Sequence, residues 1–307
     1  MIIAAWQADD TIDRSIAAAL GQIGVRCQIL VIDDASTDGL RERLSQRSDV
    51  RLAVLPANGG PAAARNRGLE LAQGTWVAVL DADDTMRPDR LRNMIDEADR
   101  LNADALLGNF VRVDENGREI EATPFLQIGQ FETQSPLTLE QYVSYNQVQP
   151  TKPSLGYLKP LIRRSFLIDH KLRYNESLRN GEDCHLIFSL LAAGARAFVS
   201  DNPDYLYTVR TGSISHRANP EHIFALIAAD KEFVNQFSDQ LSPETKHLFR
   251  TRSKSLLRLV HSEQIMSSLK NRKPAQALTL ALQHPSAIRR VVRQLYESVG
   301  KRIGVRS

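Results

Sequence analysis

The sequence predicts an α/β fold, with a mostly parallel central sheet, flanking helices and a helical region at the C-terminal end. Three features carry this prediction. Short β-rich runs alternate with helical patterns in the first part of the chain, acidic residues follow two of these runs, and helical patterns dominate after residue 216. The alternation indicates parallel strands joined by crossover helices.

The first part of the chain contains five β-rich runs of strand length. Strands are expected at 2–6, 28–32, 51–55, 75–80 and 105–110. Helical patterns separate them at 12–20, 40–47, 61–73 and 90–101. The last pattern is the clearest, because its apolar residues recur with the 3.6-residue period of an amphipathic helix.

Residues 114–156 interrupt this order with polar turn residues and four prolines. A long irregular insertion of this kind is usually a functional loop or lid. Beyond it we expect a strand at 158–162, a helix at 182–193, and strands at 197–199 and 205–210. Helices that open at or just after a proline are expected at 220–236, 243–269, 274–282 and 287–299.

Composition limits the possible functions. The chain has 307 residues, and its 39 basic and 36 acidic residues give a net charge of +3. This balance excludes a nucleic-acid binder that works through overall charge. Cys27 and Cys184 lie far apart in apolar surroundings, which indicates reduced thiols in a cytosolic protein. The start does not resemble a signal peptide, and no apolar run reaches the roughly 18 residues that cross a bilayer. A cytoplasmic protein is therefore expected.

The C-terminal end is basic. Six basic residues of the segment 287–307 stand against one acid, Glu297. Such a segment either contacts anionic lipid, at the inner face of a membrane, or is the solvated end of a polar helix.

The stretch AVLDADD places an acidic cluster directly after a predicted strand. In open α/β sheets, ligands bind beyond the carboxyl ends of the strands. Asp81 and Asp83, on either side of Ala82, point the same way in an extended segment, and two carboxylates with phosphate oxygens suit Mg²⁺ or Mn²⁺. The alternative makes Asp83 or Asp84 a helix cap in an ordinary turn.

A second acidic group follows the strand at 28–32. Asp33 and Asp34 begin the stretch DDASTDG, whose side chains are typical of caps and turns, although a carboxylate there can also accept a base N–H. The sequence has neither a Gly-x-Gly-x-x-Gly fingerprint nor a Gly-Lys-Ser/Thr phosphate loop. Arg65, in the predicted helix 61–73, either reaches a nucleotide or forms a surface salt bridge.

Two further segments carry candidate residues. Glu182 and Asp183 lie at the start of a predicted helix. Either the helix macrodipole simply stabilises these acids, or the helix holds one of them rigidly as a general base. Arg210 precedes a loop of small residues that includes Ser213, and such a loop could close over phosphates.

In this order, the segments IIAAWQADDTI, VIDDASTDG, NGGPAAARNRG, VLDADD, NGEDCHL and RTGSIS resemble the family 2 glycosyltransferases of the GT-A fold. The likeness is greatest to glucosyltransferases of bacterial exopolysaccharide biosynthesis of the succinoglycan type. It implies a GT-A domain at 1–216, with a Rossmann-like nucleotide-sugar-binding half at 1–110 and an acceptor-binding half at 111–216. Residues 217–307 form the helical region.

The resemblance also implies a reaction and its partners. A sugar, glucose as the first choice, passes from a UDP-sugar to a hydroxyl of a saccharide acceptor, such as a lipid-linked oligosaccharide. Direct displacement at the anomeric carbon inverts its configuration. Mn²⁺ or Mg²⁺ assists the departure of the nucleoside diphosphate.

Individual roles follow by matched position. Ala4 and Trp6 would line the nucleobase pocket, Asp34 would bond the base or ribose, and Arg65 would help hold the nucleotide. Asp81 and Asp83 would form the D-x-D pair, with Asp83 the direct metal ligand. Asp183 would be the catalytic base. The remaining residues, Arg210 and Ser213, would close on the diphosphate.

One departure and two rival functions remain. The family often has Pro-x-Tyr-Asn where this chain has Ala4, Ala5, Trp6 and Gln7; Trp6 can still stack on a base. A sugar nucleotidyltransferase would need a Gly-rich N-terminal loop with Arg and Lys, which is missing. A non-catalytic nucleotide-sugar-binding protein would be expected to lack the acid at Asp183.

Overall fold

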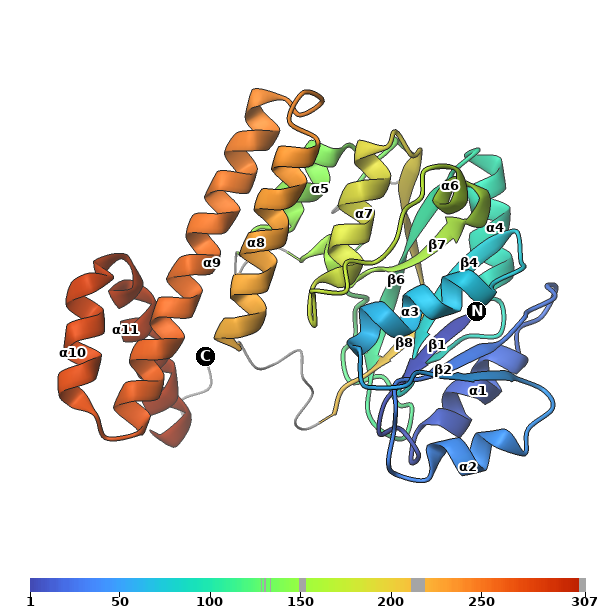
Figure 1. Ribbon diagram of the computed structural model, residues 1–307, viewed down its shortest axis with the longest axis horizontal. Helices are drawn as coiled ribbons and strands as arrows, with labels where there is room; N and C mark the ends of the chain where they lie inside the picture. Colours follow the sequence, from blue (N-terminus) through green and yellow to red (C-terminus); the bar gives the residue numbers. More distant parts are fainter. Residues whose placement is uncertain (128, 130, 133, 149–152, 211–218, 304–307) are drawn as a thin grey trace. The chain divides into compact units, whose positions relative to one another are not determined.

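A computed structural model describes residues 1–127, 129, 131–132, 134–148, 153–210 and 219–303, with side chains to residue 296. The chain forms two compact units (Figure 1). The first consists of Met1–Asn146 and Thr151–Ser213, and the second of Gln147–Pro150 and Ile214–Ser307.

The described part of the first unit is built on an eight-stranded mixed sheet, in the order β3-β2-β1-β4-β7-β6-β8-β5. The first four strands in this order are parallel, as predicted. β7 runs antiparallel to both of its neighbours, β8 is parallel to β6, and β5 is antiparallel to β8. The strands are β1 Ile2–Ala5, β2 Leu30–Asp33, β3 Arg51–Val54, β4 Trp76–Asp81, β5 Thr85–Met86, β6 Ala105–Val113, β7 Lys159–Arg163 and β8 Ala197–Thr208.

Helices cover this sheet because their apolar sides and those of the strands must be buried together. α3 lies against β1 and β2, and α4 lies against β6 and β8 (Figure 1). The α-helices of the unit are α1 Ile12–Leu20, α2 Leu40–Ser45, α3 Gly60–Leu71, α4 Arg90–Arg100, α5 Leu139–Tyr145, α6 Arg164–Asp169 and α7 Glu182–Ala192. One 3-10 turn, η1, spans Leu155–Tyr157.

Several parts of this unit differ from the sequence-based expectation, which did not include β5, α6 or η1. The insertion 114–156 contains a helix, α5, which begins with a capping box between Thr138 and Gln141. The strands expected at 197–199 and 205–210 form one strand, β8, whose pairing with β6 shifts register between Gly108 and Phe110. At the shift, the Asn109 side-chain amide donates to the Asp201 carbonyl, 3.2 Å away. Pairing with β6 therefore keeps β8 continuous across Asn202 and Pro203, a sequence that favours a break in the strand.

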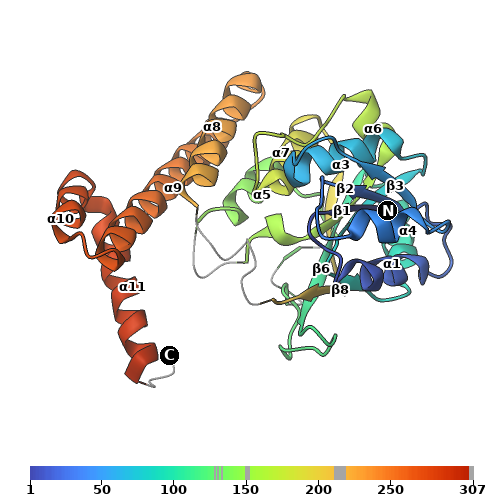
Figure 2. The same ribbon diagram turned by 60° about the horizontal axis from the view of Figure 1, so that its bottom comes forward.

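The second unit consists of helices over its described residues: α8 Pro220–Gln236, α9 Pro243–Lys270, α10 Pro274–Gln283 and α11 Pro285–Ile303. Each begins at a proline, whose missing N–H costs nothing in the first turn. α8 and α9 lie side by side, and α10 and α11 follow at the C-terminal end of α9 (Figure 2). A buried ion pair joins Arg252 Nε to Asp230 Oδ2 at 2.9 Å. None of the helices described is both long and apolar enough to span a membrane.

Candidate active site

The carboxyl ends of β1, β2 and β4 meet at one edge of the sheet. In the pairing register, Ala4 lies opposite Asp81 and Ala5 lies opposite Asp33. The two acidic groups that follow separate strands in the sequence are thereby brought beside the end of β1. This is the edge at which an open α/β sheet binds its ligand.

Asp33 and Asp34 have different environments at this edge. Asp33 Oδ1 accepts the Ser36 N–H at 2.9 Å, whereas its buried Oδ2 has no hydrogen-bond partner among the described residues. Both oxygens of Asp34 accept backbone N–H groups, from Gly59 at 2.7 Å and Gly60 at 2.8 Å. Asp34 therefore holds the start of α3, and its base-binding role stays a prediction.

The Trp6 side chain is 52% exposed at the end of β1. Its neighbour Gln7 fixes this segment to the DDASTDG loop: the Gln7 N–H donates to Ser36 Oγ at 3.0 Å, and Gln7 Oε1 accepts the Thr37 N–H at 2.8 Å. An exposed indole on an anchored backbone is suited to stack against a planar ring.

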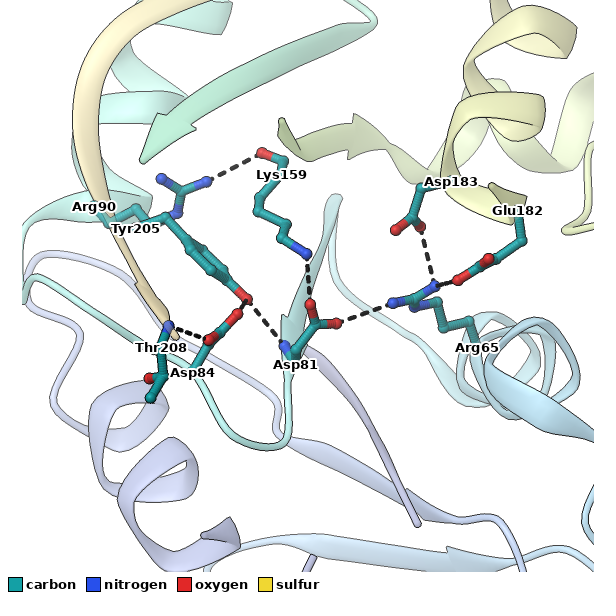
Figure 3. A network of polar contacts seen from close by, with 9 residues as sticks. All are labelled: Arg65, Asp81, Asp84, Arg90, Lys159, Glu182, Asp183, Tyr205 and Thr208. Atoms are coloured by element: carbon teal, nitrogen blue, oxygen red, sulfur yellow. Dashed lines mark hydrogen bonds and ion pairs between the residues drawn. The ribbon is translucent and has the colours of Figure 1, made fainter. Parts of the chain in front are cut away.

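Asp81 is the centre of a buried ion-pair network (Figure 3). Its Oδ2 lies 2.5 Å from Lys159 Nζ, and its Oδ1 lies 2.9 Å from Arg65 Nη2. Arg65 Nη1 continues the network to Glu182 Oε1 at 2.5 Å and to Asp183 Oδ1 at 3.2 Å, both in the first turn of α7. Arg65 therefore links the D-x-D segment to the candidate base, which lies about a hundred residues further along the chain.

One oxygen of Asp183 faces Arg65 within this network. Its Oδ1 is buried and in ion-pair contact with Arg65, but it has no hydrogen-bond partner among the residues that the structure describes. Gly181, with φ +82°, precedes α7 and allows the sharp entry of the chain. The carboxylate is thus fixed at a rigid helix start.

The two acids that follow Asp81, Asp83 and Asp84, have different environments. The side chain of Asp83 is half-buried. Asp84 is buried and accepts the Tyr205 O–H and the Thr208 N–H, each at 2.7 Å. The alternative that Asp83 or Asp84 caps a helix was wrong, because α4 begins only at Arg90, with Asp89 before it.

The pKa values of Asp81 and Asp83 are shifted in opposite directions. Burial alone would raise the pKa of Asp81, but Lys159 and Arg65 outweigh it, so this pKa lies well below the usual range. Burial opposes the charge on Lys159 as well, yet Asp81 raises the Lys159 pKa above its ordinary value. Burial, and then the charge of Asp81, raise the pKa of Asp83. An added cation would therefore stabilise the ionised form of Asp83.

The residues present fit a divalent cation through Asp83. Its carboxylate is a hard oxygen donor, whereas both oxygens of Asp81 already bind cationic side chains. Mg²⁺ and Mn²⁺ commonly use one or two carboxylates together with substrate phosphate oxygens. The described residues contain no group of three metal-binding side chains. Substrate oxygens would have to complete such a site.

Three predicted residues remain: Arg210, Ala82 and Ser213. Arg210 follows β8, with its Nε 3.9 Å from Glu115 Oε1, and its charge acts on Asp83. Ala82 is buried between the two acids of the D-x-D. Ser213 lies outside the described residues, so its predicted contact with the diphosphate remains a prediction.

Sequence reasoning missed Lys159 and Tyr205. The ammonium group of Lys159 lies 5.3 Å from the centre of the Tyr205 ring, and the Tyr205 hydroxyl accepts the Asp81 N–H at 3.2 Å. One signal was available for Lys159. A lysine at the start of an otherwise apolar strand must be paired if that strand is buried.

Comparison with known proteins identifies the family. Residues 1–152 match the model of glycosyl transferase family 2. The chain is 39% identical over 295 residues to the succinoglycan biosynthesis protein ExoO of Rhizobium meliloti, covering 94% of this chain and 82% of that protein. It is 32% identical over 118 residues to WfgD of Escherichia coli, a UDP-Glc:alpha-D-GlcNAc-diphosphoundecaprenol beta-1,3-glucosyltransferase, covering 38% and 47% of the two chains.

Solved structures agree on the fold. The crystal structure of Staphylococcus aureus TarS 1-349 with UDP-GlcNAc has a TM-score of 0.59, at 19% identity, covering 93% of this chain and 90% of that one. The mixed sheet, the acids at its carboxyl edge and the family match lead to one conclusion. The chain is a GT-A enzyme that belongs to the family 2 glycosyltransferases.

Proposed function

We propose that the chain transfers glucose from UDP-glucose to a hydroxyl of a saccharide acceptor carried on a lipid, with inversion at the anomeric carbon. The observation that carries this proposal is the Arg65 network, which holds the D-x-D segment and Asp183 together. The names of ExoO and WfgD support a role in exopolysaccharide synthesis, UDP-glucose as donor and a polyprenyl diphosphate-linked acceptor.

In the proposed reaction, Asp183 accepts the proton of the acceptor hydroxyl. The hydroxyl oxygen forms a bond to the anomeric carbon while the bond from that carbon to the diphosphate oxygen breaks, and UDP leaves with the electron pair. Because there is a single displacement, an α-linked donor gives a β-glycoside. Arg65 keeps the Asp183 carboxylate in place through their ion-pair contact.

Donor binding is assigned to the sheet edge. Trp6 stacks on the uracil, while the unpaired Oδ2 of Asp33 can accept a base N–H, together with or instead of Asp34. Asp83 would hold Mn²⁺ or Mg²⁺, which would supply positive charge beside the leaving diphosphate. Lys159 and Arg65 keep the Asp81 carboxylate at the end of β4. Arg210 closes on the diphosphate from the side of Asp83.

A cytoplasmic location is part of this proposal. Cys27 and Cys184, both among the described residues, form no disulfide, which supports a reducing compartment.

The donor is tested by UDP release from a panel of UDP-sugars, with Mn²⁺ and a polyprenyl diphosphate-linked saccharide. UDP-glucose should give the highest rate, and a clear preference for another sugar would overturn the donor assignment. The metal site is tested by calorimetric titration of UDP with and without Mn²⁺. Asp83→Asn should remove the effect of Mn²⁺ on UDP affinity, whereas Asp169→Asn, an exposed acid of α6, should keep it.

A further inference from the structure

Positive charge is concentrated at the C-terminal end of the chain. Of its 39 basic and 36 acidic residues, nine basic residues but only one acid, Glu297, lie within 270–307. The nine are Lys270, Arg272, Lys273, Arg289, Arg290, Arg293, Lys301, Arg302 and Arg306. Because the whole chain carries only +3, this segment is a cationic region on an otherwise acidic protein. Such a region is complementary to an anionic surface.

The two helices of this segment also expose apolar side chains. On α11, Val292 and Tyr296 are 58% and 80% exposed, and Ile288 lies on the same face, one turn before Val292. On α10, Leu278 and Leu282 are 62% and 74% exposed at the same four-residue spacing. In a soluble environment, large apolar side chains repeated along one helix face mark an interaction surface.

These exposed side chains are additional to those that form the core of the second unit. Ala287 and Val291 of α11 and Ala277 of α10 pack with Ile265 and Met266 of α9. α11 therefore has one apolar stripe turned to α9 and a second, through Ile288, Val292 and Tyr296, that is exposed. Arg289 is exposed beside the second stripe. The fold of this unit does not account for the second stripe.

We propose that α10 and α11 dock on an anionic lipid bilayer, with α11 lying in the plane of the interface. The exposed stripe would enter the boundary between headgroups and acyl chains, while the basic side chains pair with lipid phosphates. A helix that separates an apolar face from Lys and Arg residues binds bilayers in this way, and each basic residue near the surface adds to the affinity. The lipid class is an anionic phospholipid, because the charge excess is positive.

The test is flotation of the full chain with vesicles of phosphatidylcholine and phosphatidylglycerol, compared with vesicles of phosphatidylcholine alone. The wild-type chain should float with the anionic vesicles. V292S/Y296S should weaken this binding by about tenfold or more, because two apolar side chains no longer enter the interface. The control F224S/I168S removes two exposed apolar side chains from α8 and α6 and should float like the wild type.

A second pair of variants tests the charge. K270Q/R272Q/K273Q should weaken vesicle binding by about fivefold for each charge removed. Added salt should also weaken vesicle binding of the wild-type chain, because it screens the same charges. R250Q/K254Q/R258Q removes three exposed charges of α9 and should have little effect. Flotation needs neither donor nor acceptor, so its result is independent of the proposed reaction.

Two results would overturn the proposal. One is unchanged flotation of V292S/Y296S relative to F224S/I168S. The other is a wild-type chain that binds no vesicles but self-associates in sedimentation, with V292S/Y296S monomeric, because the stripe would then be covered by a second copy of the chain. Circular dichroism of each variant checks that the helices are retained.

Discussion

At the scale of single residues, Lys159 and Asp81 form the pair on which the site depends. Their charged atoms lie 2.5 Å apart, and Lys159 is buried. We expect Lys159→Met to lower the free energy of unfolding by about 1–3 kcal/mol, because Asp81, whose side chain is 27% exposed, loses one of its two cationic partners. Denaturant unfolding of the variant measures this loss. Lys171→Met, at an exposed position, serves as the control.

A double-mutant cycle separates the ion pair from the packing of the lysine stem. If the uncompensated charge of Asp81 causes the loss, Asp81→Asn should restore part of the stability in the Lys159→Met background. Additive losses in the double variant would show that the two side chains do not stabilise each other.

Lys159 also shows why part of the site could not be predicted from sequence. Asp81, Asp83 and Asp183 follow or begin elements that local patterns reveal, so their positions could be predicted. The partner of Asp81 is separated from it by 78 residues and lies on an antiparallel strand inserted next to β4. Local periodicity contains no information on such a pairing.

At the scale of elements, the close packing of α3 on β1 positions Arg65. Gly68 permits it, since an added Cβ would lie 2.5 Å from Ile2 Cγ2, in the buried core. Gly68→Ala should cost about 1–3 kcal/mol of stability, because core atoms must shift to admit a methyl group. Denaturant unfolding measures the cost. Ile2→Ala removes the clashing methyl, so the double variant should lose less than the sum of the single changes.

α9 carries a pH-dependent contact with the segment between α10 and α11. His261 stacks on His284 with ring centroids 3.4 Å apart, and burial, followed by the charge of His284, lowers the His261 pKa below 6.5. The unfolded chain therefore takes up the proton first as pH falls through 6.5, and stability declines until the folded pKa is passed. His261→Gln should flatten this decline in unfolding experiments across that range. An unchanged slope, or an equal effect of the exposed His247→Gln, would contradict this assignment.

Most elements were predictable because their patterns are local. α1 and α8 have the expected bounds, and the first four parallel strands differ by one or two residues at their ends. α5 was missed although Thr138 and Gln141 have capping-box spacing, because the surrounding prolines indicate irregular chain. β8 was divided because Asn202 and Pro203 favour a turn, whereas tertiary pairing with β6 continues the strand.

At the scale of the whole molecule, two carboxylates of the first unit are assigned different roles in the proposed reaction. Asp83 at the carboxyl edge of the sheet is assigned to the leaving diphosphate, and Asp183 at the start of α7 is assigned to the acceptor proton. Arg65 connects the two regions through Asp81. The assignment of 1–110 to the donor and 111–216 to the acceptor follows the same division and remains a prediction.

The most direct test of these two assignments compares wild type and Asp183→Asn. UDP release is measured with Mn²⁺, the preferred UDP-sugar and the saccharide acceptor, and UDP affinity is measured on the same samples. If Asp183 is the base, turnover should fall by about 10²–10⁴ while UDP affinity is retained, because only proton transfer from the acceptor is lost. Equal turnover of the two proteins would contradict it.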